Sequence, residues 1–220
     1  MQPEPAGGKC ELETLVCFAL DREAAPFRKI ARGIPGVSIL VTGVGSGNAE
    51  ASLRKFLAGH RVKQVFTCGF AGGLNPQLAA GDVVFMTGYP GMEKRLAAAG
   101  ARLAGFFTAR RIAITVAEKK KLREETAADV VEMESGAILE ICRLKQIPCA
   151  MVRAVSDTAN EDLPLDFNRL AKPDMSIDLR KLAWTVAISP GRIPALMQLQ
   201  KQTRLAAGQL AAVLAKIISP

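Results

Sequence analysis

Residues 129–157 read DVVEMESGAILEICRLKQIPCAMVRAVSD, and they predict a strand, a helix and a second strand in succession. The run 129–133 is short and apolar, as a buried strand is. The run 135–146 has the spacing of apolar residues that an amphipathic helix shows, and Pro148 ends that helix. The run that follows Pro148 is again apolar until its last residues, so it predicts a strand with a polar end.

The same alternation extends along the rest of the chain. It predicts an α/β fold, a three-layer sandwich in which a mostly parallel mixed sheet has helices on both faces. We expect a flexible tail over 1–11 and a single domain over 12–220. Further strands are predicted at 15–20, 37–45, 62–73, 81–88 and 110–117, and helices at 22–32, 48–59, 93–105, 117–128 and from Met175 onward, with a break at 189–191.

Composition excludes several classes of protein. Apolar residues make up 49% of the 220 residues, with one Trp and one Tyr, which is typical of parallel strands covered by helices. No apolar stretch approaches the roughly 20 residues of a membrane span, so we expect a cytoplasmic protein. The five cysteines are odd in number and form no CxxC pair, and His60 is the single histidine. We therefore expect no metal site, no Ser-His-Asp triad and no cofactor.

The net charge of +8 raises the question of an anionic partner. Lys and Arg are dispersed, and the one run, Lys119 to Lys121, is followed by Arg123-Glu124-Glu125. This pattern predicts a solvated, mixed-charge helix face. The sequence has no basic patch interleaved with aromatic residues, so no nucleic acid is expected. Peripheral contact with an anionic membrane is the alternative.

Polar and glycine residues gather where the predicted strands end, which is where ligands bind in such sheets. The turn 43–47, GVGSG, favours an oxygen-rich ligand, and tight strand–helix packing is the structural alternative. A dinucleotide loop is disfavoured because no acidic residue ends a strand about 20 positions later, and a methyltransferase loop because no acidic residue precedes Gly43. Glu132-Met133-Glu134 places two carboxylates at a strand–helix junction, where they serve a ligand or act as first-turn charges. By the same reasoning Asp157 is a helix cap or a proton donor.

In combination, Glu23 after the first strand, the glycine turn at 43–47, TCGFAGGL (67–74), VVEMES (130–135) and RAVSD (153–157) resemble the nucleoside phosphorylase and nucleosidase superfamily. Within it the chain is similar to methylthioadenosine/S-adenosylhomocysteine nucleosidases and, more closely, to hopanoid-associated nucleosidases that remove adenine from adenosylhopane. The resemblance covers roughly residues 13–170, and the pair of VVEMES and RAVSD at this spacing is its most specific part.

The resemblance implies an enzyme that cleaves the N-glycosidic bond of a purine nucleoside, with adenine as the expected base and a modified 5′ group. Asp157 matches the acid that protonates the leaving base, and Glu23 matches the residue that activates water. Glu134 matches the acceptor of the ribose hydroxyls, and Met133 the residue that packs on the sugar. Substrate contacts are further expected at Gly45, Phe70, Ala71, Gly72 and Ser156.

Water is favoured over phosphate as the attacking group. Thr67 and Phe70 stand near the positions where phosphorylases of this family have an arginine and a serine, although Arg22 or Arg153 would supply charge instead. Three alternatives stay open: a phosphorylase, an inactive nucleoside-binding protein of the same fold, and a methyltransferase that uses GVGSG. The segment between Asp82 and Glu132 is shorter than in the methylthioadenosine enzymes, which leaves either a more open pocket or an inactive one. Relatives assemble as oligomers, so we expect a homo-oligomer. The expected binding partner is a small-molecule nucleoside, the substrate.

Overall fold

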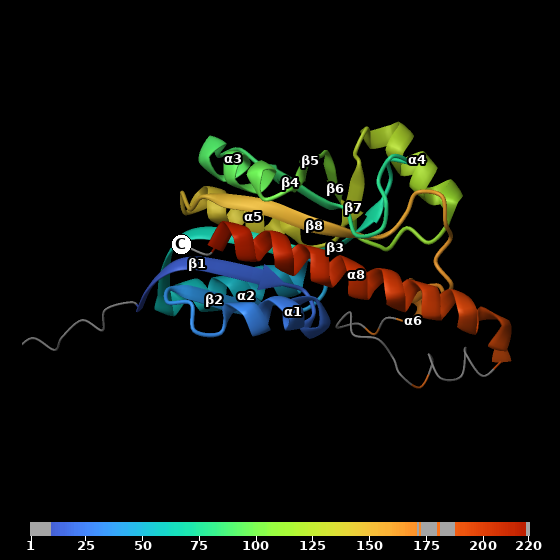
Figure 1. Cartoon of the computed structure of the whole chain (residues 1–220), viewed down its shortest axis with the longest axis horizontal. Helices are drawn as coiled ribbons and strands as arrows, with labels where there is room; N and C mark the ends of the chain where they lie inside the picture. The colour runs from blue at the N-terminus through green and yellow to red at the C-terminus, as the bar shows by residue number, and fades with distance from the viewer. Residues whose placement is uncertain (1–9, 171, 173–179, 181–187, 219–220) are drawn as a thin grey trace, which may run out of the picture.

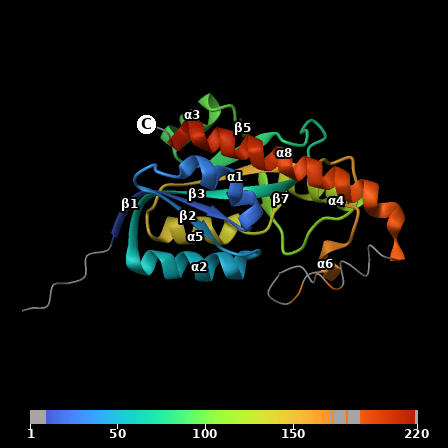
Figure 2. The same ribbon diagram turned by 60° about the horizontal axis from the view of Figure 1, so that its bottom comes forward.

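The computed structural model describes residues 10–170, 172, 180 and 188–218. A central sheet lies between two layers of helices (Figures 1 and 2). The helices α1 (Asp21–Ala31), α3 (Pro90–Ala98) and α8 (Ile193–Ile218) pack on one face, and α2 (Ser46–Gly59) and α5 (Ser135–Leu144) pack on the other. The predicted three-layer α/β architecture is confirmed.

The sheet is mixed and mostly parallel. Its order is β2-β1-β3-β8-β4-β5, and β7 pairs with both β3 and β6. Most pairs are parallel, while β8 with β4 and β3 with β7 are antiparallel. The strands are β1 (Cys10–Phe18), β2 (Val37–Val41), β3 (His60–Gly73), β4 (Val83–Thr87), β5 (Arg102–Leu103), β6 (Phe106–Thr108), β7 (Val130–Glu132) and β8 (Cys149–Asp157).

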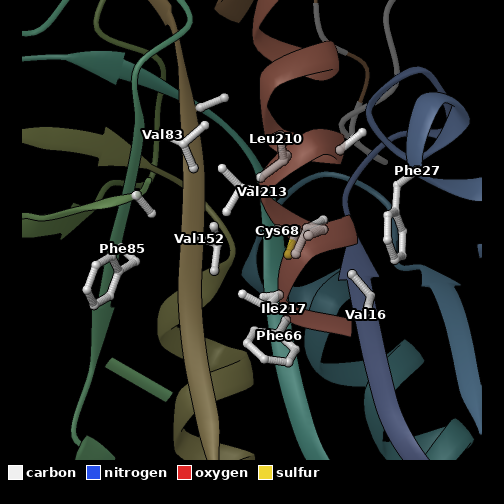
Figure 3. Close-up of a cluster of buried hydrophobic side chains, with 14 of the residues drawn as sticks. Val16, Phe27, Phe66, Cys68, Val83, Phe85, Val152, Leu210, Val213 and Ile217 are labelled. Atoms are coloured by element: carbon white, nitrogen blue, oxygen red, sulfur yellow. The ribbon is translucent and has the colours of Figure 1, made fainter. Parts of the chain in front are cut away.

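The two helical layers are held by apolar side chains that alternate along each strand. In β1, Leu15 packs with the α2 and α5 layer, and the next residue, Val16, packs with the α1 and α8 layer. Successive strand residues point to opposite faces, so a continuous apolar run serves both layers. Figure 3 shows the α8 side, where Leu210 and Val213 of α8 meet the side chains of the central strands.

The C-terminal end of β3 pairs with both β7 and β8. β3 has 14 residues, and its register with β8 shifts between Ala71 and Gly72. Gly72 and Gly73 then pair with Val131 and Val130 of β7. The end of β3 therefore lies between the end of β8 and the short strand that leads into α5.

The predicted strand at 110–117 is wrong, because the strand is β6 at Phe106–Thr108. The backbone of Ile112 is bonded instead by the side chain of Asn168, which donates to its carbonyl and accepts from its amide at 2.9 Å each. α4 (Val116–Thr126) then begins with Thr115 as its cap. The predicted helix over 93–105 is too long, since α3 ends at Ala98 before Gly100, whose φ is +99°.

The two ends of the chain differ in part from the prediction. β1 begins at Cys10, inside the predicted tail, and the rest of that tail lies outside the described residues, as does most of 175–187. The short elements α6 (Phe167–Leu170) and η1 (Pro190–Arg192) precede α8, and η1 falls at the predicted break. Among the described helices, α8 included, none combines the length and the apolar content needed to cross a membrane.

Truncation of Leu210 should destabilise the protein strongly, because this side chain is fully buried between α8 and the sheet. We expect Leu210→Ala to lower the free energy of unfolding by about 2–5 kcal/mol in chemical denaturation. Met197→Ala on the same helix is the control, since Met197 is 55% exposed and should change stability little. Equal losses in both variants would show that α8 does not close this face.

Candidate active site

Glu23 lies in the first turn of α1, with its carboxylate turned toward the end of β3. One carboxylate oxygen accepts from the amide of Leu20 at 2.9 Å, and the other accepts from the amide of Phe70 at 3.1 Å. A Cβ atom on Gly69 would lie 3.1 Å from Glu23 Oε1, so a larger residue there would crowd the carboxylate. Burial raises the pKa of Glu23, and the two amide bonds and Arg153 oppose that rise.

Glu134 precedes α5, and its carboxylate reaches across to the start of α2. Its Oε1 accepts from the amide of Gly45 at 3.0 Å, and Gly45 has a φ of +90°, which favours glycine. Ser46 adds a second link by donating to the carbonyl of Met133 at 2.9 Å. Burial raises the pKa of Glu134 to about 7 against the effect of Arg153, and the charge of Glu23 adds to the rise. Two predicted substrate residues, Gly45 and Glu134, are therefore in contact.

Glu132, the other carboxylate of the motif, has a different role. It is buried, and its Oε2 accepts from the amides of Glu134 and Ser135 at 3.0 and 2.8 Å and from Arg153 at 2.9 Å. Thr108 donates to its Oε1 at 2.5 Å. Arg153 holds the pKa of Glu132 below its usual range although burial alone would raise it. Glu132 is thus an ionised anchor that fixes the backbone from which Glu134 projects.

Arg153 is fully buried and connects four elements. Its terminal nitrogens donate to the Thr67 carbonyl at 2.7 Å, to Ser135 Oγ at 2.7 Å and to Glu132. Nε has no hydrogen-bond partner within the described residues. Because Arg153 lowers the pKa of both Glu23 and Glu134, its positive charge is shared by the two carboxylates of the predicted site.

Asp157 ends β8, beside Gly72 of β3. Ser156 donates to its Oδ1 at 2.6 Å, and Lys119 of α4 donates to its Oδ2 at 2.6 Å. Both carboxylate oxygens thus accept a hydrogen bond from a side chain, and in the described part of the chain neither bonds a helix amide. The helix-cap interpretation of Asp157 is therefore wrong.

Lys119 corrects the interpretation of the lysine run. Its exposed fraction is 0%, and it forms a buried ion pair, so it does not belong to a solvated face. Lys120 and Lys121, whose side chains are 76% and 74% exposed, behave as expected. Composition could not separate the three, but helical phase could, because Lys119 and not its neighbours lies three residues before the partly buried Leu122.

The end of β3 is the feature that Glu23 and Asp157 share. Glu23 contacts Gly69 and Phe70, Asp157 lies beside Gly72, and strand residues two apart are separated by about 7 Å. Two cavities of about 400 and 440 Å³ are lined by other residues. What relates the two carboxylates is therefore their contacts with the same end of β3. The side chain of Ala71 packs into a buried apolar cluster, and its carbonyl lies 3.3 Å from Ser156 Oγ.

Within the described part of the chain, no group of three or more His, Cys, Asp or Glu residues is arranged to hold a metal ion. The four cysteines described as free, Cys17, Cys68, Cys142 and Cys149, are buried. Burial raises the pKa of the Cys68 thiol, so it is not activated as a nucleophile. The chemistry of this site is that of carboxylates and two buried cations.

Comparison with known proteins identifies similar chains. The family model described as "Phosphorylase superfamily" matches residues 26–109 and 104–185. An aminodeoxyfutalosine nucleosidase from Campylobacter jejuni is 25% identical over 159 residues, which are 57% of this chain and 69% of that protein. A 5′-methylthioadenosine/S-adenosylhomocysteine nucleosidase from Bacillus cereus is 26% identical over 168 residues, 60% of this chain and 73% of that protein.

Solved structures match over nearly the whole chain. The 5′-methylthioadenosine/S-adenosylhomocysteine nucleosidase of Helicobacter pylori, solved with butyl-thio-DADMe-Immucillin-A, has a TM-score of 0.72 at 14% identity and covers 94% of this chain and 98% of that one. At this identity the likeness shows the fold.

The unusual pKa of Glu134 should be visible in stability. The folded-state pKa of about 7 lies above the ordinary 4.5, so the folded chain holds this proton more tightly than the unfolded chain does. The resulting stability is present below the ordinary pKa and is lost as the pH rises through 7. We expect Glu134→Gln to reduce the fall in unfolding free energy between pH 5 and pH 8 by up to about 3 kcal/mol, measured by denaturation without ligand. Glu124→Gln, at a solvent-exposed carboxylate, should keep the wild-type difference; an unchanged difference in Glu134→Gln would contradict the assignment.

Proposed function

The chain belongs to the phosphorylase superfamily, and we propose that it is a nucleosidase that hydrolyses the N-glycosidic bond of a purine nucleoside. The observation that carries the proposal is that Glu23 and Asp157 both contact the end of β3, while Glu134 lies close enough to Glu23 for the charge of Glu23 to raise the pKa of Glu134. Glycosidic cleavage develops positive charge on the sugar and negative charge on the leaving base. Carboxyl groups on the two sides of one reacting bond suit that distribution.

On the sugar side, Glu134 accepts hydrogen bonds from the ribose hydroxyls, and Met133 packs on the ring. The Glu134 carboxylate is held by Gly45, so one oxygen is fixed and the other remains for the substrate. A charged acceptor strengthens such bonds and steadies the developing cation. Phe70 and Gly72, which adjoin the carboxylates of Glu23 and Asp157, belong to the same substrate site.

Glu23 positions the attacking water and takes its proton. A general base works best when its pKa lies toward the working pH, and burial raises the pKa of Glu23 in that direction. The amides of Leu20 and Phe70 keep the carboxylate in one orientation. Asp157, with Ser156 beside it, delivers the proton to the leaving base.

Water is preferred over phosphate because the cations of the site are already engaged. Both terminal nitrogens of Arg153 bond Thr67, Glu132 or Ser135, and Thr67 is itself buried against Arg153. A phosphate would have to compete with these bonds for its charge partner. Phosphorolysis is the alternative, and binding without catalysis is the next.

We propose adenine as the base and a modified 5′ group on the ribose. The named relatives act on nucleosides of this kind, and the resemblance to hopanoid-associated enzymes makes adenosylhopane one candidate. The same resemblance supports a cytoplasmic homo-oligomer. Peripheral membrane contact is an alternative role for the first turns of α8, where Ile193 and Met197 are exposed.

A panel of purine nucleosides with different 5′ groups, assayed for free base with and without inorganic phosphate, tests the proposal. We expect release of adenine at a rate that phosphate does not change. Release that requires phosphate would establish the phosphorylase instead. Tight binding of a nucleoside with no release would establish the inactive binder.

Replacement of the proposed acid should remove activity and spare the fold. We expect Asp157→Asn to lower kcat by about 100-fold or more, because an amide does not deliver the proton. Glu124→Gln, at a solvent-exposed carboxylate of α4, is the control outside the proposed chemistry. Base release near the wild-type rate in Asp157→Asn would overturn the assignment.

A further inference from the structure

Lys119 of α4 forms a buried ion pair with Asp157, the proposed acid. It is fully buried in a helix whose other lysines are exposed, and its ammonium lies 2.6 Å from Asp157 Oδ2. A buried ion pair is weak evidence of stabilisation, because removing two charges from water costs about as much as their attraction returns. The pair therefore calls for another explanation, and its position at the proposed acid supplies one.

Three acceptors surround the Lys119 nitrogen, and they match its three hydrogens. Besides Asp157, Nζ donates to the carbonyls of Thr158 at 2.7 Å and Glu161 at 2.9 Å. The loop that carries both carbonyls is braced, since the Glu161 carboxylate accepts from the amide of Thr158 at 2.7 Å and from Gln202 of α8 at 3.0 Å. The cradle is thus fixed from two sides.

This cradle also suits the neutral form of Lys119. After loss of one proton, the amine keeps two N–H groups for the two carbonyls, and its lone pair accepts from a protonated Asp157. No polar group loses its partner when the proton moves from Nζ to Oδ2. An arrangement that satisfies both protonation states lowers the cost of moving a proton between them.

We propose that Lys119 and Asp157 act as one acid, in which Lys119 is the source of the proton that Asp157 passes to the leaving base. The inference rests on the nucleosidase function proposed above and extends it to a residue of α4. Asp157 touches the base, whereas Lys119 acts through Asp157 and is a positioning and proton-supplying residue.

The bond between the sugar and the base breaks, and its electron pair goes to the base. A proton moves from Lys119 Nζ to Asp157 Oδ2, and the Asp157 carboxyl gives a proton to a ring nitrogen of the purine. Asp157 is left as the carboxylate and Lys119 as the neutral amine. Water adds to the sugar and gives its proton to Glu23. Before the next turnover Glu23 releases that proton to the solvent and Lys119 takes up a proton from the solvent.

The experiment compares two leaving groups in the full-length protein. One substrate is the nucleoside that the panel identifies, and the other is a nitrophenyl riboside with the same 5′ group, whose phenolate leaves without being protonated. We expect Lys119→Met to lower kcat for the nucleoside by at least about tenfold with little change in KM, and to keep the riboside rate within about threefold of wild type. Lys120→Met is the control, because this neighbouring side chain is exposed, and it should leave both rates unchanged.

Lys119→Met leaves Asp157 without its charge partner and risks a loss of folding, so the double variant Lys119→Met/Asp157→Asn is measured as well. It removes both charges, and if the pair is one acid its nucleoside rate equals that of Asp157→Asn alone. A further loss in the double variant, equal losses on both substrates, or no loss in Lys119→Met would each overturn the inference. Failure of the wild type to cleave either substrate would instead overturn the proposed function.

Discussion

The buried pair of Arg153 and Glu132 is the interaction on which the geometry of the site depends. Arg153 rises from β8 and reaches Thr67 of β3 and Ser135 of α5, while Glu132 ends β7. Glu132 in turn accepts the amides that open α5. Through these contacts, the Arg153–Glu132 salt bridge sets the direction in which Glu134 projects, before any substrate binds.

The pair also explains how a site with several carboxylates remains folded. Glu23, Glu132 and Glu134 are all buried, and each would be costly to ionise alone. Arg153 favours the charged form of all three, most directly that of Glu132, with which it is in contact. The result is a graded set, in which Glu132 is firmly ionised while Glu23 and Glu134 keep raised pKa values. Three buried glutamates thus acquire different chemistry, because only Glu132 is in direct contact with the cation and accepts several further hydrogen bonds.

Much of this arrangement could be predicted from the sequence. Alternation of apolar runs and helical patterns predicted the layers and most of the elements, and the strand-end rule directed attention to Glu23, Glu134 and Asp157. The sequence could not tell which of Glu132 and Glu134 serves the substrate, because both belong to one motif. They differ in that Glu132 pairs with the buried Arg153, which only the fold reveals. It missed Lys119 because its partner Asp157 is far along the chain, and a run of lysines reads as solvated. The strand expected at 110–117 does not form. The side chain of Asn168, which is distant in sequence, bonds the backbone of Ile112 instead.

The position of α8 has a consequence for how the protein is made. α8 covers the middle of the sheet, yet it follows all the strands in chain order. A ribosome releases the strands first, so the apolar face that Leu210 and Val213 later cover stays open to the solvent until this helix emerges. For that interval the nascent chain exposes the kind of surface that chaperones bind, and a pause in translation before α8 would prolong the risk of aggregation.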